Sequence, residues 1–442
     1  MKVSLNNFRA FPQTPDISVK PLTILVGENS SGKTSLLAAL RFAFELSRLD
    51  STSFFNVYPF DLGPYEDIVH SSGHQGTDKR FSVTIEKYVN TGGDRQFRLG
   101  LNEKNEEILV RTTFFFRSSY GDTVLSSIRM IIEESQMDLH LPENGPPSLT
   151  IDDKTFAIGQ EELFAPPTGR SILSLQTALY MLVSFRFRDR KNAKHDSKDG
   201  KLLERFAAIY DAFISNNHEV VSSPPVRSVP RKVYTGSDDI QGEANANAPH
   251  ELSKLKRSDA RRWARINKGL SRFGRQSGLF SRFDIKKLTQ QNSGPFQVKV
   301  TVRNRSSTIA DVGYGVSQSL PIMTDLIVHS NQPSALLLQQ PEVHLHPRAQ
   351  AELGTMFSEF VTKNSKGFIV AETHSDHLID RIRIEVREGK LNPSLVNIVF
   401  FCSEGNDVEI YQLDLDKQGN LIGAPKSYRQ FFIREQERVL GF

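Results

Sequence analysis

The stretch GENSSGKT at residues 27–34 decides the fold prediction, because it has the spacing of a phosphate-binding loop, G-x-x-x-x-G-K-T. An apolar run, LTILV at residues 22–26, precedes it, and the helix-forming run SLLAAL follows it. Glycines let the main chain curl so that several N–H groups face one anion, and the following helix adds the positive end of its dipole. The stretch therefore predicts a nucleotide-phosphate site between a strand and a helix.

The side chains of this loop have separate expected roles. Lys33 would reach the β- and γ-phosphates, and the Thr34 hydroxyl would bind Mg²⁺, so we expect ATP and Mg²⁺ as cofactors. The alternative is a chance glycine loop, and the flanking strand and helix argue against it. The other residues expected to contact the phosphates are Asn29, Ser30, Gly32 and Ser35.

The composition is that of an ordinary globular protein. The chain has 442 residues, 38% of them hydrophobic and 24% charged, with a net charge of +4. A single cysteine, Cys402, excludes an internal disulfide framework and fits a reducing compartment. No apolar run approaches the ~20 residues of a membrane span, and the N-terminus lacks the apolar core of a signal peptide. We therefore expect a cytoplasmic protein without a membrane partner.

Three segments are expected along the chain. Residues 1–120 form the first part of an ATPase head, with the P-loop and alternating stretches typical of an antiparallel sheet. Residues 121–292 form a mainly helical, basic insertion, with one helix expected at 171–185. Residues 293–442 form the second part of the head, where strands alternate with helices, which is the pattern of a parallel sheet.

A second glycine-containing segment, DVGYGVSQSLP at residues 311–321, leads into an apolar helix. It resembles the signature segment of ABC-type ATPase heads, in the version found in chromosome-maintenance, RecF-like and OLD-like ATPases. The alternative is a simple helix cap, with Ser317 as the N-cap residue. The resemblance implies that the γ-phosphate of ATP held by a partner subunit is contacted by Gly313, Gly315, Ser317 and Gln318.

Two further apolar runs end in polar residues, ALLLQQPEVHLHP at 335–347 and GFIVAETHSDH at 367–377. Such strand ends gather at the carboxyl edge of a parallel sheet. In ABC-type heads the first run holds the Walker B residues and the second holds a switch histidine, here His374. In order and spacing the chain is similar to the AAA_15/AAA_21 group of bacterial ATPases, which share the OLD-type head. The resemblance covers residues 1–90 and 300–442. It implies an α/β fold with a mixed N-terminal sheet lobe and a parallel-sheet, RecA-like lobe.

The first of these runs departs from the resembled pattern at its end. The family usually carries an acid there to hold the Mg²⁺ shell, and often a second acid as general base, but here the residues are Gln339 and Gln340. An amide oxygen can lie near a cation or position water, yet it takes no proton at neutral pH. Three explanations compete: a branch with slow turnover, another acid such as Glu342 as base, or a substituted chain. We expect slow hydrolysis, with Gln340, Glu342 and His374 as the catalytic set and Thr34 and Gln339 beside Mg²⁺.

Two histidines in the first run, His344 and His346, suggest metal ligation. No carboxylate or cysteine constellation accompanies them, and the resembled family has this HLHP as a structural turn. We therefore expect a turn rather than a metal site. His374 and His377 in the second run receive the same interpretation.

A basic region extends over residues 254–287, with twelve Lys or Arg and two acids. Aromatic residues, including Trp263, are interleaved with the cations. Such a cluster fits the phosphate backbone of a nucleic acid, without a motif that reads bases. The alternative is a solvated helix whose cations pair with acidic groups of the same protein or of a neighbour. DNA is therefore a candidate partner.

The resemblance implies an ATP-binding switch or clamp. Such a chain would form a homodimer or a higher oligomer, with ATP between the P-loop and the partner's signature segment. It would regulate a separate effector such as a nuclease, in bacterial antiviral defence. A DNA-maintenance ATPase of the RecF/SMC type is the first alternative. The ATP-binding subunit of a transporter is a disfavoured second alternative, because a long stretch separates the P-loop from the signature segment.

Overall fold

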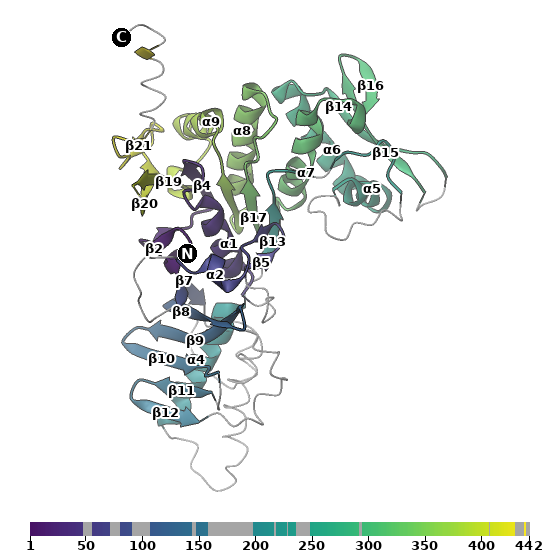
Figure 1. Cartoon of the computed structure of the whole chain (residues 1–442). Coiled ribbons are helices and arrows are strands. Elements are labelled where there is room, and N and C mark those ends of the chain that lie inside the picture. Colours follow the sequence, from purple (N-terminus) through teal and green to yellow (C-terminus); the bar gives the residue numbers. More distant parts are fainter. Residues whose placement is uncertain are drawn as a thin grey trace. The chain divides into compact units, whose positions relative to one another are not determined.

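The computed structural model describes most of the chain, and its contacts divide it into two compact units, shown in Figure 1. Unit 1 comprises residues 1–19, 38–217 and 405–408, and unit 2 comprises residues 20–37, 218–404 and 409–442. The described residues are 1–46, 55–70, 80–90, 107–143, 147–157, 198–215, 218–227, 229–235, 248–290, 294–405, 407–428 and 437–438.

Unit 1 is built on a nine-stranded antiparallel sheet of order β12-β11-β10-β9-β8-β7-β1-β2, with β3 paired to β1 (Figure 1). Buried and less buried residues alternate along β8, so one face of the sheet is covered. The strands are β1 (Lys2–Phe8), β2 (Phe11–Gln13), β3 (Ile17–Ser18), β7 (Phe81–Asn90), β8 (Glu107–Ser119), β9 (Asp122–Ile132), β10 (Ser135–His140), β11 (Ser148–Ile151) and β12 (Lys154–Ala157). The described residues of unit 1 also include a short hairpin, β5 (Asn56–Val57) with β6 (Phe60–Asp61), and the helices α2 (Tyr65–Ile68) and α4 (Lys198–Ile214).

Aromatic side chains fill the core of unit 1. Phe81 and Phe116 stack with ring centroids 4.9 Å apart, and Phe42 meets Phe114 edge to face at 5.2 Å. Phe55 contacts Phe42, Phe81 and Phe116, so the rings form one continuous cluster. Edge-to-face and stacked pairs add to the free energy of burial, so this cluster contributes to the stability of unit 1.

The predicted helical insertion at residues 121–292 differs from the structure in its first part. Residues 122–157 form β9 to β12, and each strand pairs with the strand before it. Their alternating residues bury one face, so they extend the antiparallel sheet. The helix expected at 171–185 lies outside the described residues.

Unit 2 contains a seven-stranded sheet of order β13-β17-β18-β4-β19-β20-β21. Its first five strands pair in parallel. The strand β13 falls inside the predicted insertion but belongs to this sheet. The bounds are β4 (Leu22–Gly27), β13 (Glu219–Ser223), β17 (Ser334–Gln339), β18 (Gly367–Glu372), β19 (Val396–Glu404), β20 (Asp407–Leu415) and β21 (Leu421–Ile422).

Three helices each lead into the next strand of this sheet (Figure 1). They are α7 (Tyr314–Val328), α8 (Pro347–Lys363) and α9 (Asp376–Arg387), with short 3₁₀ turns at η3 (Ile309–Asp311) and η4 (Pro393–Leu395). The helix α1 (Lys33–Phe44) begins directly after the P-loop, with residues 33–37 in unit 2 and residues 38–44 in unit 1. Because β17, β18 and β4 are parallel neighbours, their carboxyl ends share one edge of the sheet. That edge therefore gathers the P-loop and both polar strand ends predicted above.

The rest of unit 2 is a three-stranded antiparallel sheet with two helices. The elements are α5 (Ala248–Ser258), α6 (Ala260–Ser277), β14 (Arg282–Lys287), β15 (Phe296–Val302) and β16 (Arg305–Thr308). Asp259 caps α6 by accepting the N–H of Arg262 at 2.8 Å, so this basic helix begins at Ala260.

The predicted α/β fold class is confirmed by the antiparallel sheet of unit 1 and the mainly parallel sheet of unit 2. Within the described part of the chain, no helix is long and apolar enough to cross a membrane.

Candidate nucleotide-binding site

The P-loop leaves the sheet at Gly27, where the buried strand β4 ends. Gly27 has φ +143°, and a Cβ placed there would lie 2.3 Å from the carbonyl oxygen of Phe401 in β19. Only glycine fits this close approach of two main chains. Gly32, with φ +89°, makes the second sharp turn directly before α1. The two glycines of the motif therefore lie at positions where a residue with a side chain would have a strained main chain.

Lys33 folds back into the concave side of this loop. Its ammonium donates hydrogen bonds to the carbonyl oxygens of Gly27 at 3.2 Å and of Glu28. The side chain is 3% exposed, and this burial lowers the pKa of Lys33. Uncharged carbonyls are weak partners for an ammonium, so a phosphate oxygen can replace them.

Thr34 begins the first turn of α1 and reaches the neighbouring strand β18. Its hydroxyl donates a 2.9 Å hydrogen bond to a carboxylate oxygen of Glu372, the last residue of β18. Glu372 is only 6% exposed. The threonine oxygen keeps its lone pairs, so a cation could bind between this hydroxyl and the carboxylate.

Glu372 was not among the residues predicted for the site. In the second apolar run, the sequence predicts a role for His374 but none for the acid two residues before it. Its function depends on β18 lying beside β4, with Glu372 in register with Leu25. The sequence signal that could have identified Glu372 is an acid at the end of an apolar strand.

Gln339 and Gln340 lie at the end of β17, one strand further from the P-loop. Gln339 is in register with Glu372, so the amide and the carboxylate occupy adjacent strand ends. Gln340 has φ +41°, and its N–H donates to the Glu372 carbonyl oxygen at 2.8 Å. Within the described residues the two side-chain amides make no hydrogen bond. Both amides therefore remain available at the site.

Glu342 and His374 contact one another through the main chain. The His374 N–H donates to Glu342 Oε1 at 2.8 Å, and the carboxyl group is 6% exposed. Burial raises the pKa of Glu342. The pKa of His374 is lowered, first by burial and then by the charge of Lys33, so the neutral imidazole is favoured. His374 therefore bonds to Glu342 through its main-chain N–H and is influenced by the charge of Lys33.

The signature helix α7 begins at Tyr314, after Gly313. Gly315 packs against the loop that follows β17, because a Cβ at this position would lie 2.8 Å from the carbonyl oxygen of His344. The Ser317 hydroxyl donates to the Tyr314 carbonyl oxygen at 3.0 Å, inside the helix. The interpretation of Ser317 as N-cap is therefore wrong.

Gln318 lies on the inner side of α7 and is 3% exposed. Its side-chain oxygen accepts the N–H of Arg227 at 3.1 Å. This side chain is thus bonded within its own chain. The resemblance implies that Gln318 contacts the ATP of a partner subunit, and that contact stays a prediction. Arg227, like Glu372, was not predicted as a site residue.

The HLHP segment is a turn with a structural role for each histidine. His346 precedes α8, and its Nδ1 accepts the N–H of Arg348 at 3.3 Å. The His344 ring lies 5.8 Å from the Tyr314 ring, between centroids. In the described ranges, no group of three His, Cys, Asp or Glu residues could hold a metal ion.

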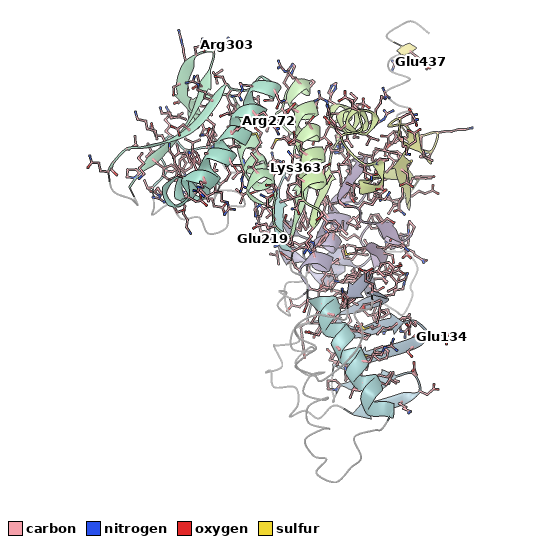
Figure 2. All side chains as sticks on the ribbon, turned by 180° about the vertical axis from the view of Figure 1, so that it is seen from behind. Glu134, Glu219, Arg272, Arg303, Lys363 and Glu437 are labelled. Atoms are coloured by element: carbon pink, nitrogen blue, oxygen red, sulfur yellow. The ribbon has the colours of Figure 1, made fainter. Side chains whose placement is uncertain are left out.

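The basic region is partly neutralised within the chain. Arg272 of α6 and Lys363 of α8, both labelled in Figure 2, contact Glu359 at 2.6 and 2.7 Å. Lys268 and Arg265 are exposed and pair with no acid among the described residues. All five residues line one cavity of about 410 Å³ between α6, α7 and α8. The local charge is therefore positive, although smaller than the sequence suggests.

Comparison with known proteins gives one family and several structures. The family AAA_15, described as an AAA ATPase domain, matches residues 1–379. The chain is similar to the Smc head bound to the C-winged helix domain of ScpA, with TM-score 0.45, 12% identity, and 94% of this chain and 98% of that chain covered. A Smc head with an extended coiled coil, bound to the C-terminal domain of ScpA derived from Pyrococcus furiosus, gives TM-score 0.41, 12% identity and coverage of 99% and 98%. The SMC head domain from Thermotoga maritima gives TM-score 0.35, 11% identity and coverage of 92% and 97%. No curated protein sequence matches.

Proposed function

Because the chain belongs to the AAA_15 family of ATPase domains, we propose that it binds ATP with Mg²⁺ and uses the bound nucleotide as a conformational switch. The observation that carries this proposal is the geometry of the P-loop. Lys33 is buried against carbonyl oxygens, and the Thr34 hydroxyl faces the Glu372 carboxylate. The phosphates would be held by Lys33 and by the loop, through Asn29, Ser30, Gly32, Thr34 and Ser35.

The residues at the strand ends fit a magnesium ion. Mg²⁺ prefers hydroxyl, carboxylate, water and phosphate oxygens. Thr34 would offer its hydroxyl oxygen and Glu372 would hold the bound water. Gln339, in register with Glu372, would offer its amide oxygen from the neighbouring strand end. When bound, the ion would neutralise phosphate charge and orient the γ-phosphate. Glu372 thus supplies the negative charge that the end of β17 lacks.

Hydrolysis is proposed to be slow. Gln340 can orient a water molecule but takes no proton from it. Glu342 has a raised pKa, which suits a base, yet one of its oxygens is occupied by the His374 N–H. His374, with its lowered pKa, can accept a hydrogen bond from a water near Lys33. Without a strong general base, ATP would stay bound for long enough to act as a conformational signal.

We propose that two subunits enclose ATP between them. Gly313 has open space around its Cα, and Tyr314 is 61% exposed. The first N–H groups of α7 have no acceptor within the helix, so a phosphate of the partner's ATP can bind there. Gly313, Gly315 and Ser317 would form this contact, whereas Gln318 would support it from inside.

The partner is proposed to be a separate effector. By family resemblance this is a nuclease in bacterial antiviral defence, and the setting is the cytoplasm. A DNA-maintenance ATPase is the second proposal, favoured by Arg265 and Lys268, which pair with no acid among the described residues. Co-purification with and without ATP separates the two: an associated nuclease supports the first, and bound DNA with no second protein supports the second.

The test of ATP binding is titration with a fluorescent ATP analogue. Wild-type protein should bind it in the presence of Mg²⁺, and Lys33→Ala should weaken binding by at least roughly tenfold. The control is Lys390→Ala, because Lys390 is exposed and, among the described residues, pairs with the acid Glu388 alone. Equal affinity of wild type and Lys33→Ala would refute the proposal.

A further inference from the structure

Arg227 follows β13 and is only 3% exposed. Its guanidinium donates to Ser223 Oγ at 3.2 Å, to the Gln318 carbonyl oxygen at 3.2 Å, and to the carbonyl oxygens of Gln339 and Gln340 at 3.4 and 3.3 Å. Its own N–H donates to Gln318 Oε1 at 3.1 Å. One side chain therefore bonds to β13, to the end of β17 and to α7.

The guanidinium is a buried positive charge that faces two buried acids. Burial lowers the pKa of Arg227 to about 10, while Glu342 and Asp325 oppose the shift, so the group stays protonated at neutral pH. An ion this deeply buried is costly unless acids or hydrogen bonds compensate it. Burial raises the pKa of both acids, so they compensate the guanidinium charge only in part, and three main-chain carbonyls supply further acceptors. These bonds indicate that Arg227 also holds the carbonyls in place.

The groups that bond to Arg227 belong to two places: the proposed ATP site of the same chain and the signature helix α7. Gln339 and Gln340 stand beside Glu372, on the side of the chain's own P-loop. Gln318 lies in the second turn of α7, whose first turn is the proposed contact with the partner's ATP. Gln340 has φ +41°, a conformation that costs free energy and persists only where the surroundings impose it. Arg227 is one of the groups that impose it.

We propose that Arg227 is a positioning residue that couples the chain's own ATP site to its signature helix. Nucleotide bound at the P-loop fixes Gln339 and Gln340, their carbonyls fix the guanidinium, and the guanidinium fixes Gln318. Arginine suits this role because its planar group directs donors toward several acceptors at once, whereas lysine has a single nitrogen. The inference rests on the proposed ATP switch, but it concerns coupling within one subunit.

The test compares wild type, Arg227→Lys and Lys33→Ala by hydrogen exchange, with and without ATP and Mg²⁺. Protein is kept dilute enough to remain monomeric. Arg227→Lys keeps a positive charge opposite Asp325 and Glu342, so its fold should survive, but it loses the several donors. Arg383→Lys is the matched control, since Arg383 also bonds to a main-chain carbonyl, that of Gly419, far from this cluster in sequence. Binding of the fluorescent ATP analogue gives the occupancy of each variant.

In wild type, ATP should slow exchange in residues 316–320 by roughly tenfold, because opening of α7 becomes costlier. Arg227→Lys should bind ATP with affinity within about twofold of wild type and yet show less than about twofold slowing. Arg383→Lys should behave as wild type. In Lys33→Ala, adding ATP should not change the exchange rate.

Three results would overturn the coupling role. One is equal slowing in Arg227→Lys at equal occupancy, and another is a parallel loss of ATP binding and slowing, which indicates a general structural role. The third is wild-type protein that binds ATP without slower hydrogen exchange in α7. This result tests the proposal even if Arg227→Lys does not fold. ATP binding itself would stand in that case, so failure of the coupling is distinguishable from failure of the switch.

Discussion

The Thr34 hydroxyl donates a 2.9 Å hydrogen bond to the carboxylate of Glu372, which ends the strand beside the P-loop strand. The adjacent strand β17 ends instead in Gln339, in register with Glu372. A carboxylate is thus present at the sheet edge that carries the P-loop. It lies on β18, one strand closer to the P-loop than the position at the end of β17 where the resembled family carries its acid. This arrangement supports a site in which cation binding is preserved and proton transfer is weakened.

Glu372→Gln should raise the Mg²⁺ concentration needed for half-maximal ATP binding by roughly tenfold, because residues that orient metal ligands contribute about this much to affinity. ATP binding without Mg²⁺ should change little. The measurement is a titration with the fluorescent ATP analogue at several Mg²⁺ concentrations. Glu385→Gln is the matched control, since Glu385 is equally buried and also accepts a threonine hydroxyl, from Thr355 at 2.7 Å. An unchanged Mg²⁺ dependence in Glu372→Gln would exclude Glu372 from the cation site.

Gln340→Glu should raise ATP turnover by at least roughly tenfold, because a positioned general base contributes about 10² or more to rate. Turnover is measured as phosphate release under saturating ATP and Mg²⁺. Gln276→Glu is the control for an added charge, because Gln276 is an exposed residue of α6. If Gln340→Glu leaves turnover unchanged, the amides are not what slows hydrolysis.

Gly315→Ala should destabilise the protein by about 1–3 kcal/mol, because its Cβ would meet the His344 carbonyl oxygen at 2.8 Å. Gly313→Ala should fold as wild type, since nothing lies within 4 Å of its added Cβ. It should still weaken ATP-dependent self-association if this segment meets the partner's ATP. Thermal unfolding and mass measurements check the two effects, and equal stability of both variants would contradict the packing described for α7.

Asp325→Asn should change the pH dependence of stability. Burial raises the pKa of Asp325 well above its usual value, so the folded protein keeps a proton that the unfolded chain loses above about pH 3.8. Its contribution to stability is therefore full below that pH and falls as pH rises, by up to ~1.4 kcal/mol per pH unit. The asparagine variant does not lose stability in this way, because its side chain does not titrate. Its melting temperature relative to wild type should increase from pH 5 to pH 7.5, and a pH-independent difference would be inconsistent with the burial of a protonated carboxyl group.

Local signals in the sequence predicted the P-loop, the signature helix and both polar strand ends, because each combines a strand or helix pattern with turn residues. The strands β9 to β12 were missed because the wider region 121–292 was read as helical. Glu372 and Arg227 were missed for another reason: their partners Thr34 and Gln318 lie far away in the chain. Only the order of strands in the sheet brings these groups together.

The most direct test of the account is the mass of the purified chain in solution, by mass photometry, with and without ATP and Mg²⁺. Wild-type protein should change from a monomer of 49.8 kDa to at least twice that mass on adding ATP, and Lys33→Ala should remain monomeric. ATP-bound wild type that stays at the monomer mass, or Lys33→Ala that doubles equally, would contradict the proposed switch.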